Sequence, residues 1–259
     1  MRGLLVKNKF IFNLFKKGIL YYRFLKSISV ITKSRTYEKS KFVKIIDIND
    51  RNHHCFFGYY NKRIFSMNDD FIIFHKVPKK KSHKSKIILL NLKTNEEKVV
   101  SETVAWNWQQ GSMLQWLNNS NEEIIFNSYS DDIGYVTLKY NLNTEETETY
   151  NLPTYCLHNE NDKFLSLNFQ RLQKLALGYG YPIIDSLNEL SEDGVWEYNT
   201  KTNSLKILIS LLDVINFLGI KNAKSDSCYI NHLEYIPNSD DFIFIFRTLN
   251  KDGLFYSRL

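Results

Sequence analysis

The chain has 259 residues and a net charge of +6, a length that allows a single β domain with a sizeable core. Its three cysteines have no paired spacing, which argues against a disulfide framework and a zinc site and favours a reducing compartment. No apolar run reaches the roughly 18 residues of a membrane-spanning helix. The 18 Phe and 16 Tyr, with only 10 Gly and 4 Pro, indicate high β propensity.

The N-terminal arm, residues 1–40, carries most of the positive charge. Residues 1–36 contain nine Lys or Arg and no acid, so the remaining residues sum to −3. Apolar residues alternate with these charges, which predicts a basic amphipathic helix. Two interpretations stay open: a peripheral membrane contact through residues 1–36, or a helix packed on the next domain with its basic face in water. No base-reading motif accompanies the charge, so nucleic acid is not a predicted partner.

The expected location is cytoplasmic, because no small-residue cleavage site follows the apolar stretches of the arm. If the arm does bind a membrane, the protein would be peripheral to the inner membrane.

Two short phrases recur in step along the rest of the chain. One is an Asn-x-x-Thr turn between alternating apolar runs, typical of a β-hairpin. The other is an acidic turn that leads into a nearly continuous apolar run, typical of a strand buried on both faces. The first phrase begins at Asn91, Asn141 and Asn199, and the second covers residues 68–70, 121–123, 161–163 and 239–241.

A hairpin unit that repeats every 50-odd residues predicts an all-β fold, a β-propeller with four-stranded blades. The predicted domain covers residues 41–259, with blades at about 54–100, 106–151, 155–211 and 228–259. The fourth blade lacks a predicted outer strand, and propellers have about 4–8 blades. We therefore expect an incomplete propeller, either a partial chain or one completed by a partner. The alternative is a β-sandwich whose hairpins resemble one another by chance.

Aromatic and amide side chains gather on or just before the predicted inner strands, which line the channel of a propeller. Flat rings stack on sugar rings and amides bridge pairs of hydroxyl groups, so the cluster predicts a carbohydrate site at the channel mouth. For any single residue, ordinary blade packing is the alternative. The predicted substrate-binding residues are His54, Tyr59, Tyr60, Trp106, Asn107, Trp108, Gln109, Gln110, Arg171 and Asn231.

Two arginines, Arg171 and Arg247, each follow a predicted buried strand. A guanidinium group there is suited to hold a carboxylate with two parallel hydrogen bonds, as a uronic acid would need. A structural ion pair with an acid of a neighbouring turn is the alternative for both.

Four phrases resemble a family of bacterial propeller proteins related to the oligogalacturonate-lyase and TolB-like propellers. They are HHCFFGYYNK from His53, AWNWQQGSMLQW from Ala105, LNFQRLQKLALGYGYP from Leu167 and NHLEYIPNSDDFIFIFR from Asn231. The resemblance covers about residues 54–259 and implies a longer, closed propeller. It also implies a role in surface-polysaccharide biosynthesis, with a carbohydrate or polysaccharide intermediate as the partner.

The cofactor stays unknown. Oligogalacturonate lyases hold a metal through several His and one Gln, and by position in the blade only His232 has a counterpart here. One imidazole does not hold a manganese-like ion tightly. We therefore predict no metal site in this chain alone, and a divalent metal only in a complete propeller.

Three functions compete, and whether the protein is an enzyme is left open. The first is a lyase-like enzyme of capsule or O-antigen biosynthesis or modification, with His232 as the base and Arg247 as the carboxylate clamp. The second is a non-catalytic propeller that binds sugar or acts as a scaffold. The third is a glycosyltransferase, which ranks last because the Asp-x-Asp element on an α/β sheet is absent from the sequence.

Overall fold

The computed structural model describes residues 48, 50–80, 82–176, 178–182, 187–221, 223–249 and 255–259, all in the unit that begins at Ile48. The predicted basic arm and its membrane contact lie outside these residues. No helix of the described part is long and apolar enough to cross a membrane.

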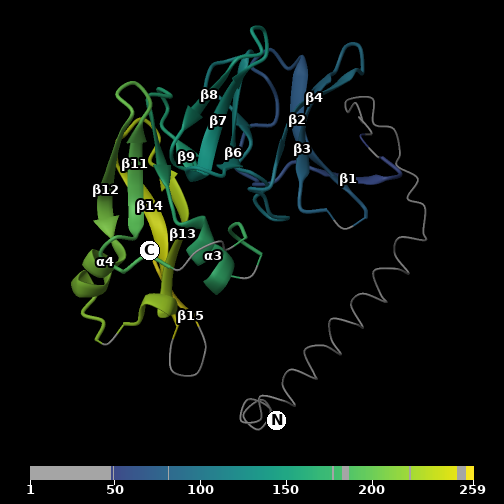
Figure 1. Ribbon diagram of the computed structural model, residues 1–259. Helices are drawn as coiled ribbons and strands as arrows, with labels where there is room; N and C mark the ends of the chain where they lie inside the picture. Colours follow the sequence, from purple (N-terminus) through teal and green to yellow (C-terminus); the bar gives the residue numbers. More distant parts are fainter. Residues whose placement is uncertain are drawn as a thin grey trace, which may run out of the picture. The chain divides into compact units, whose positions relative to one another are not determined.

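Four small antiparallel sheets follow one another along the chain, each built from consecutive strands (Figure 1). Blade 1 has β1 (His53–Phe56), β2 (Phe71–Pro78), β3 (Ser85–Asn91) and β4 (Glu97–Thr103). Blade 2 has β5 (Gln115–Trp116), β6 (Glu123–Ser130), β7 (Gly134–Asn141) and β8 (Thr147–Tyr150). Blade 3 has β9 (Cys156–Leu157), β10 (Lys163–Ser166), β11 (Gly194–Asn199) and β12 (Ser204–Ser210). Blade 4 has β13 (Cys228–Tyr235), β14 (Phe242–Leu249) and β15 (Phe255–Arg258). The predicted β-propeller, with three four-stranded blades and part of a fourth, is confirmed.

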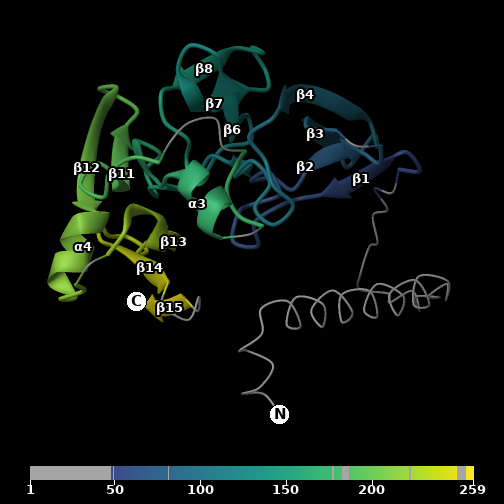
Figure 2. The same ribbon diagram turned by 60° about the horizontal axis from the view of Figure 1, so that its bottom comes forward.

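The antiparallel order sorts the connections into two faces. Turns between first and second strands, and between third and fourth strands, lie at one end of the blades, here called the turn face. Connections between second and third strands, and between blades, lie at the other end, here called the loop face. The loop face carries two short helices, α3 (Phe169–Leu175) after β10 and α4 (Leu211–Phe217) after β12. Helix α3 packs against β13, and α4 packs against β12 and β13 (Figures 1 and 2).

The recurring Asn-x-x-Thr phrase forms the same turn three times. The side-chain oxygen of Asn141 accepts hydrogen bonds from the backbone N–H groups two and three residues later, at 2.9 and 3.1 Å. Asn91 and Asn199 do the same in their own blades. An asparagine oxygen that replaces a backbone acceptor in this way favours a turn over a continued strand. The phrase therefore recurs because it closes the outer hairpin of a blade.

The predicted burial of the second strands holds in three blades and fails in the fourth. Within β2, β6 and β10 most residues are buried on both faces, and Ile73 and Phe126 meet in the core between blades 1 and 2. In β14 only Phe246 is buried, and Ile243 is 47% exposed. A strand is buried on both faces only when another sheet or segment covers each of them, and in the described residues one face of blade 4 is open.

Candidate functional site

Two loops meet on the inner side of blades 1 and 2. After β1 the chain leaves the sheet over residues 57–62, here called the excursion, and then pairs again with β2 at Phe65. The second loop, residues 104–112, precedes β5 and is here called the tryptophan loop. A Cβ atom on Gly58, whose φ is +127°, would lie 2.8 Å from the carbonyl oxygen of Gln110. Glycine at position 58 therefore allows the two loops to touch backbone to backbone.

A buried histidine that the sequence analysis did not single out fixes this contact. His75 lies inside β2 and is fully buried. Its Nε2 accepts the backbone N–H of Ser112 at 3.0 Å, so its Nδ1 carries the hydrogen and donates to the carbonyl oxygen of Phe57 at 2.6 Å. Burial lowers the pKa of His75 to about 4, which keeps the ring neutral. The sequence offered one signal, a polar residue inside an apolar strand.

A network of hydroxyl, imidazole and amide groups occupies the centre of the described blades. Tyr59, on the excursion, places its hydroxyl oxygen 2.7 Å from Nδ1 of His232 on β13. The hydroxyl oxygen of Tyr155, which precedes β9, accepts the backbone N–H of His232 at 3.0 Å and Nε2 of Gln110 at 3.2 Å. Oε1 of Gln110 is buried without a partner among the described residues. All four blades are represented, because Gln110 leads into blade 2.

His232 owes its position to a β-bulge. The register of β13 against β14 shifts between Asn231 and Glu234, and His232 has a φ of +52°. A non-glycine residue in the left-handed region stores backbone strain, and bulges often redirect a side chain next to a functional site. Burial, followed by the charge of Arg247, lowers the pKa of His232, while Glu234 acts in the opposite direction. The imidazole is therefore neutral at pH 7.

The amides of the tryptophan loop bind the loop that follows α3. Gln109 donates from Nε2 to the hydroxyl of Tyr179 at 2.6 Å, and Asn107 donates from Nδ2 to the carbonyl oxygen of Gly180 at 3.0 Å. The side-chain oxygen of Asn107 accepts the backbone N–H groups of Gln109 and Gln110. The ring of Tyr179 lies edge-on to that of His232 at 6.1 Å. These contacts join the tryptophan loop to the central network.

Four aromatic rings from β1 and the tryptophan loop form a platform. Trp108 is 58% exposed and meets the rings of His54 at 5.6 Å, Trp106 at 5.0 Å and Phe56 at 5.1 Å. Trp106 also donates from its indole nitrogen to the carbonyl oxygen of His83 at 2.9 Å. The three ring contacts of this aromatic platform restrain Trp108, while more than half of the residue stays exposed.

The other predicted residues occupy separate places. Arg247 donates from Nε to the side-chain oxygen of buried Asn231 at 3.1 Å, which places its guanidinium group on β14 near His232. Tyr60 is 81% exposed and its ring contacts Tyr59. Arg171 lies apart, buried in α3.

Arg171 forms an ion pair with an acid of its own domain, which was the alternative to a contact with a ligand carboxylate. Its Nε lies 2.6 Å from Oδ2 of Asp193, and its remaining nitrogens donate to the carbonyl oxygens of Ser225, Cys228 and Asn188. Both side chains of the pair are almost completely buried. Arg171 thus joins α3 to the loops before β11 and β13, and a ligand carboxylate would have to displace Asp193.

The residues around His232 do not fit a divalent metal ion. Nδ1 of His232 is occupied by Tyr59, and the charge of Arg247 opposes a second cation. His54 lies in the aromatic platform, away from the central network.

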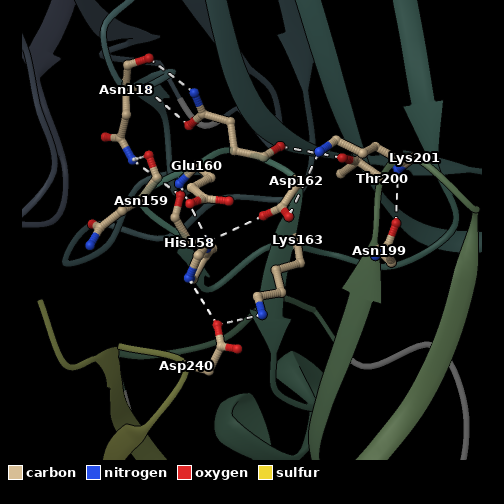
Figure 3. Close-up of polar contacts among 11 residues, drawn as sticks. Asn118, His158, Asn159, Glu160, Asp162, Lys163, Asn199, Thr200, Lys201 and Asp240 are labelled. Atoms are coloured by element: carbon tan, nitrogen blue, oxygen red, sulfur yellow. Dashed lines mark hydrogen bonds and ion pairs between the residues drawn. The ribbon is translucent and has the colours of Figure 1, made fainter. Parts of the chain in front are cut away.

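A different group, on the turn face, contains donor atoms of the kind that bind metals: His158, Glu160 and Asp162 (Figure 3). Both ring nitrogens of His158 are engaged, Nδ1 with Asp162 and Nε2 with Asp240, each at 3.1 Å. Lys163 also pairs with Asp240. This group connects the acidic turn of blade 3 to that of blade 4, and its hydrogen bonds account for it without an ion.

Two surface grooves lie away from these residues. One, of about 470 Å³, is lined by residues of β6, β7 and β8, and the other, of about 450 Å³, by the corresponding residues of blade 1. Lys139 crosses the first groove in ion pairs with Glu123 and Glu148. Because the same groove lies at corresponding positions in blades 1 and 2, we attribute it to the repeated structure of the blades.

The fold defines the class of protein, a β-propeller, and the candidate site lies on and beside the first strands of its blades. No protein-family model matches the chain, and no curated protein matches it. Oligogalacturonate lyase from Vibrio parahaemolyticus is similar in structure, with a TM-score of 0.48 and 12% identity over 81% of this chain and 54% of that one. TolB from Acinetobacter baumannii has a TM-score of 0.38 and 10% identity over 79% of this chain and 43% of that one. The β-propeller domain of the Trilobed protease from Pyrococcus furiosus has a TM-score of 0.37 and 12% identity over 81% and 57%. The chain thus spans about half the length of these structures.

Proposed function

We propose that this protein binds a carbohydrate chain across the aromatic platform and the adjoining tryptophan loop. The observation that carries the proposal is the exposure of Trp108 within a set of rings that fixes its orientation. An indole ring offers a large apolar face to the C–H groups of a sugar ring. A ring that is already held in place loses little side-chain entropy when a ligand stacks on it.

The polar neighbours of Trp108 supply hydrogen bonds for sugar hydroxyl groups. Gln109 is exposed, and it already donates to Tyr179, so its carbonyl oxygen remains available as an acceptor. Tyr60 presents its hydroxyl group from the excursion. Arg247, near His232, favours ligands that carry negative charge, such as a uronic acid.

The sequence resemblance supports a role in the biosynthesis or modification of a bacterial surface polysaccharide, capsule or O-antigen. A polysaccharide intermediate would then be the ligand, and the protein would act as a binding or scaffold component. The lyase and glycosyltransferase alternatives stay predictions, as do the cytoplasmic location and the membrane contact of residues 1–36.

A glycan array probed with the full chain tests the proposal. We expect binding to oligosaccharides, strongest for those that contain uronic acid, and about fivefold weaker binding for Gln109→Ala, the effect of one lost hydrogen bond of ~1 kcal/mol. Lys201→Ala, an exposed residue of the turn face, is the matched control and is expected to bind as the wild type does. A folded protein that binds no glycan on an array of neutral and acidic chains would contradict the proposal.

A further inference from the structure

The hydrogen bonds around His232 determine which of its ring nitrogens carries the hydrogen. We propose that Tyr59 and Tyr155 hold neutral His232 in the tautomer protonated on Nε2, so that its half-buried ring offers a ligand a hydrogen-bond donor instead of a base. The assignment of the tautomer stands on its own, whereas the role toward a ligand rests on the proposed function.

Tyr155 is a hydrogen-bond acceptor at the centre of the network. Its hydroxyl oxygen receives two N–H donors, the backbone of His232 at 3.0 Å and the amide of Gln110 at 3.2 Å. A hydroxyl oxygen has two acceptor positions, so Tyr155 uses both and directs its own hydrogen elsewhere. Tyr59 is 2% exposed, and the hydrogen-bond partner of its hydroxyl group among the described residues is Nδ1 of His232.

The direction of the next bond follows. A buried hydroxyl hydrogen needs an acceptor, and the acceptor positions of Tyr155 are filled, so Tyr59 donates to Nδ1 of His232 at 2.7 Å. A neutral imidazole that accepts on Nδ1 must carry its hydrogen on Nε2. His75 shows the opposite arrangement, since its Nε2 accepts from Ser112 and its Nδ1 donates to Phe57. His75 and His232 are thus both held by hydrogen bonds, but in opposite tautomers.

The charged and titratable groups that face His232 keep it neutral. Tyr59, Tyr155 and Tyr179 surround the ring from three loops, with Arg247 on the neighbouring strand and Glu234 on its own. Burial and Arg247 together lower its pKa, and only Glu234 opposes them. Proton abstraction by Nε2 would first require the hydrogen to move to Nδ1 and the bond from Tyr59 to reverse. A donor role for His232, with Tyr59 and Tyr155 as positioning residues, agrees with binding and disagrees with the lyase hypothesis.

Long-range ¹H–¹⁵N correlation spectra of the uniformly ¹⁵N-labelled full chain, recorded above pH 7, test the tautomer. The chain has six histidines, and the loss of one set of signals in His232→Gln assigns His232. We expect a protonated Nε2 and an unprotonated Nδ1 for His232, and the reverse for His75. Wild-type spectra in which His232 carries its hydrogen on Nδ1 would overturn the proposal, whatever any variant does.

Two conservative variants test whether Tyr59 determines the tautomer of His232. Tyr59→Phe removes only the donor to Nδ1, and we expect a mixed tautomer population for His232. Tyr179→Phe is the control, because the Tyr179 ring touches His232 while its hydroxyl binds Gln109, and the tautomer should stay as in the wild type. An unchanged tautomer in folded Tyr59→Phe would refute the positioning role of Tyr59.

The affinity for a ligand tests separately whether His232 acts as a hydrogen-bond donor to it. With a galacturonate oligomer as the probe, His232→Gln, whose amide N–H can replace Nε2–H, should retain more affinity than His232→Asn, whose shorter side chain cannot reach as far. Equal losses in the two variants would contradict the donor role. If the oligomer fails to bind the wild type, the proposed function fails for this ligand, while the spectra still decide the tautomer.

Discussion

Replacing Arg171 by alanine is expected to lower the free energy of unfolding by about 3–5 kcal/mol. The change leaves Asp193 buried without its ion-pair partner and removes the donors to the carbonyl oxygens of Asn188 and Ser225. Burial already raises the pKa of Asp193, with Arg171 as the largest opposing effect, so the carboxyl group will be protonated more easily once the guanidinium group is gone.

Urea denaturation followed by circular dichroism measures this loss. Lys206→Ala is the matched control, because it also removes a cation paired with an acid, Glu197, but the Lys206 side chain is 64% exposed. Exposed pairs contribute about 0–1 kcal/mol, so the control should remain near the wild type. Equal effects in the two variants would show that the Arg171 ion pair does not hold α3 and its neighbouring loops together. The double change Arg171→Met with Asp193→Leu should recover part of the loss.

The second large effect is expected for Gly111→Ala, at about 2–4 kcal/mol of stability. Gly111 has a φ of +61°, and a Cβ atom there would lie 2.4 Å from Cε1 of His75. Because His75 is buried and bonded to Phe57 and Ser112, its ring cannot move without breaking those bonds. The substitution should therefore also displace the tryptophan loop and weaken glycan binding.

Gly219→Ala separates the two causes of the expected loss of stability, which are strain in a left-handed backbone and the clash of the added Cβ atom with His75. Gly219 has nearly the same backbone conformation, with a φ of +63°, but an added Cβ atom would meet nothing within 4 Å. We expect about 1 kcal/mol from the left-handed backbone alone. Denaturation midpoints of the two variants, measured side by side, should differ clearly. A Gly111→Ala protein no less stable than Gly219→Ala would mean that His75 does not fix the tryptophan loop.

The sheets could be predicted from the sequence because each hairpin is a local structure. The Asn141 turn and the apolar run of β6 lie within one blade, where side-chain patterns and turn chemistry act over a few residues. β14 is the instructive failure: its apolar sequence predicted burial on both faces, but burial depends on a neighbouring sheet or segment that the sequence of one strand does not reveal.

The candidate site could be predicted only in part, because it depends on contacts between distant segments. The sequence pointed to Trp108 and His232, but it gave no sign of the bulge that turns His232 or of the excursion that brings Tyr59 to it. Tyr155 was missed because nothing in its local sequence marks it, although it accepts two hydrogen bonds in the centre. Arg171 belongs to a capped helix and pairs with Asp193, and its local sequence did not distinguish this ion pair from a contact with a ligand.

Calorimetric titration of the full chain with an acidic oligosaccharide that binds on the array, compared between Trp108→Ala and the wild type, tests the site most directly. Phe217→Ala is the control, since Phe217 is 90% exposed on α4 and outside the platform. We expect Trp108→Ala to bind at least about tenfold more weakly, a loss of ~1.4 kcal/mol or more, and Phe217→Ala to bind as the wild type does. Wild-type affinity in folded Trp108→Ala would contradict the carbohydrate site on the aromatic platform.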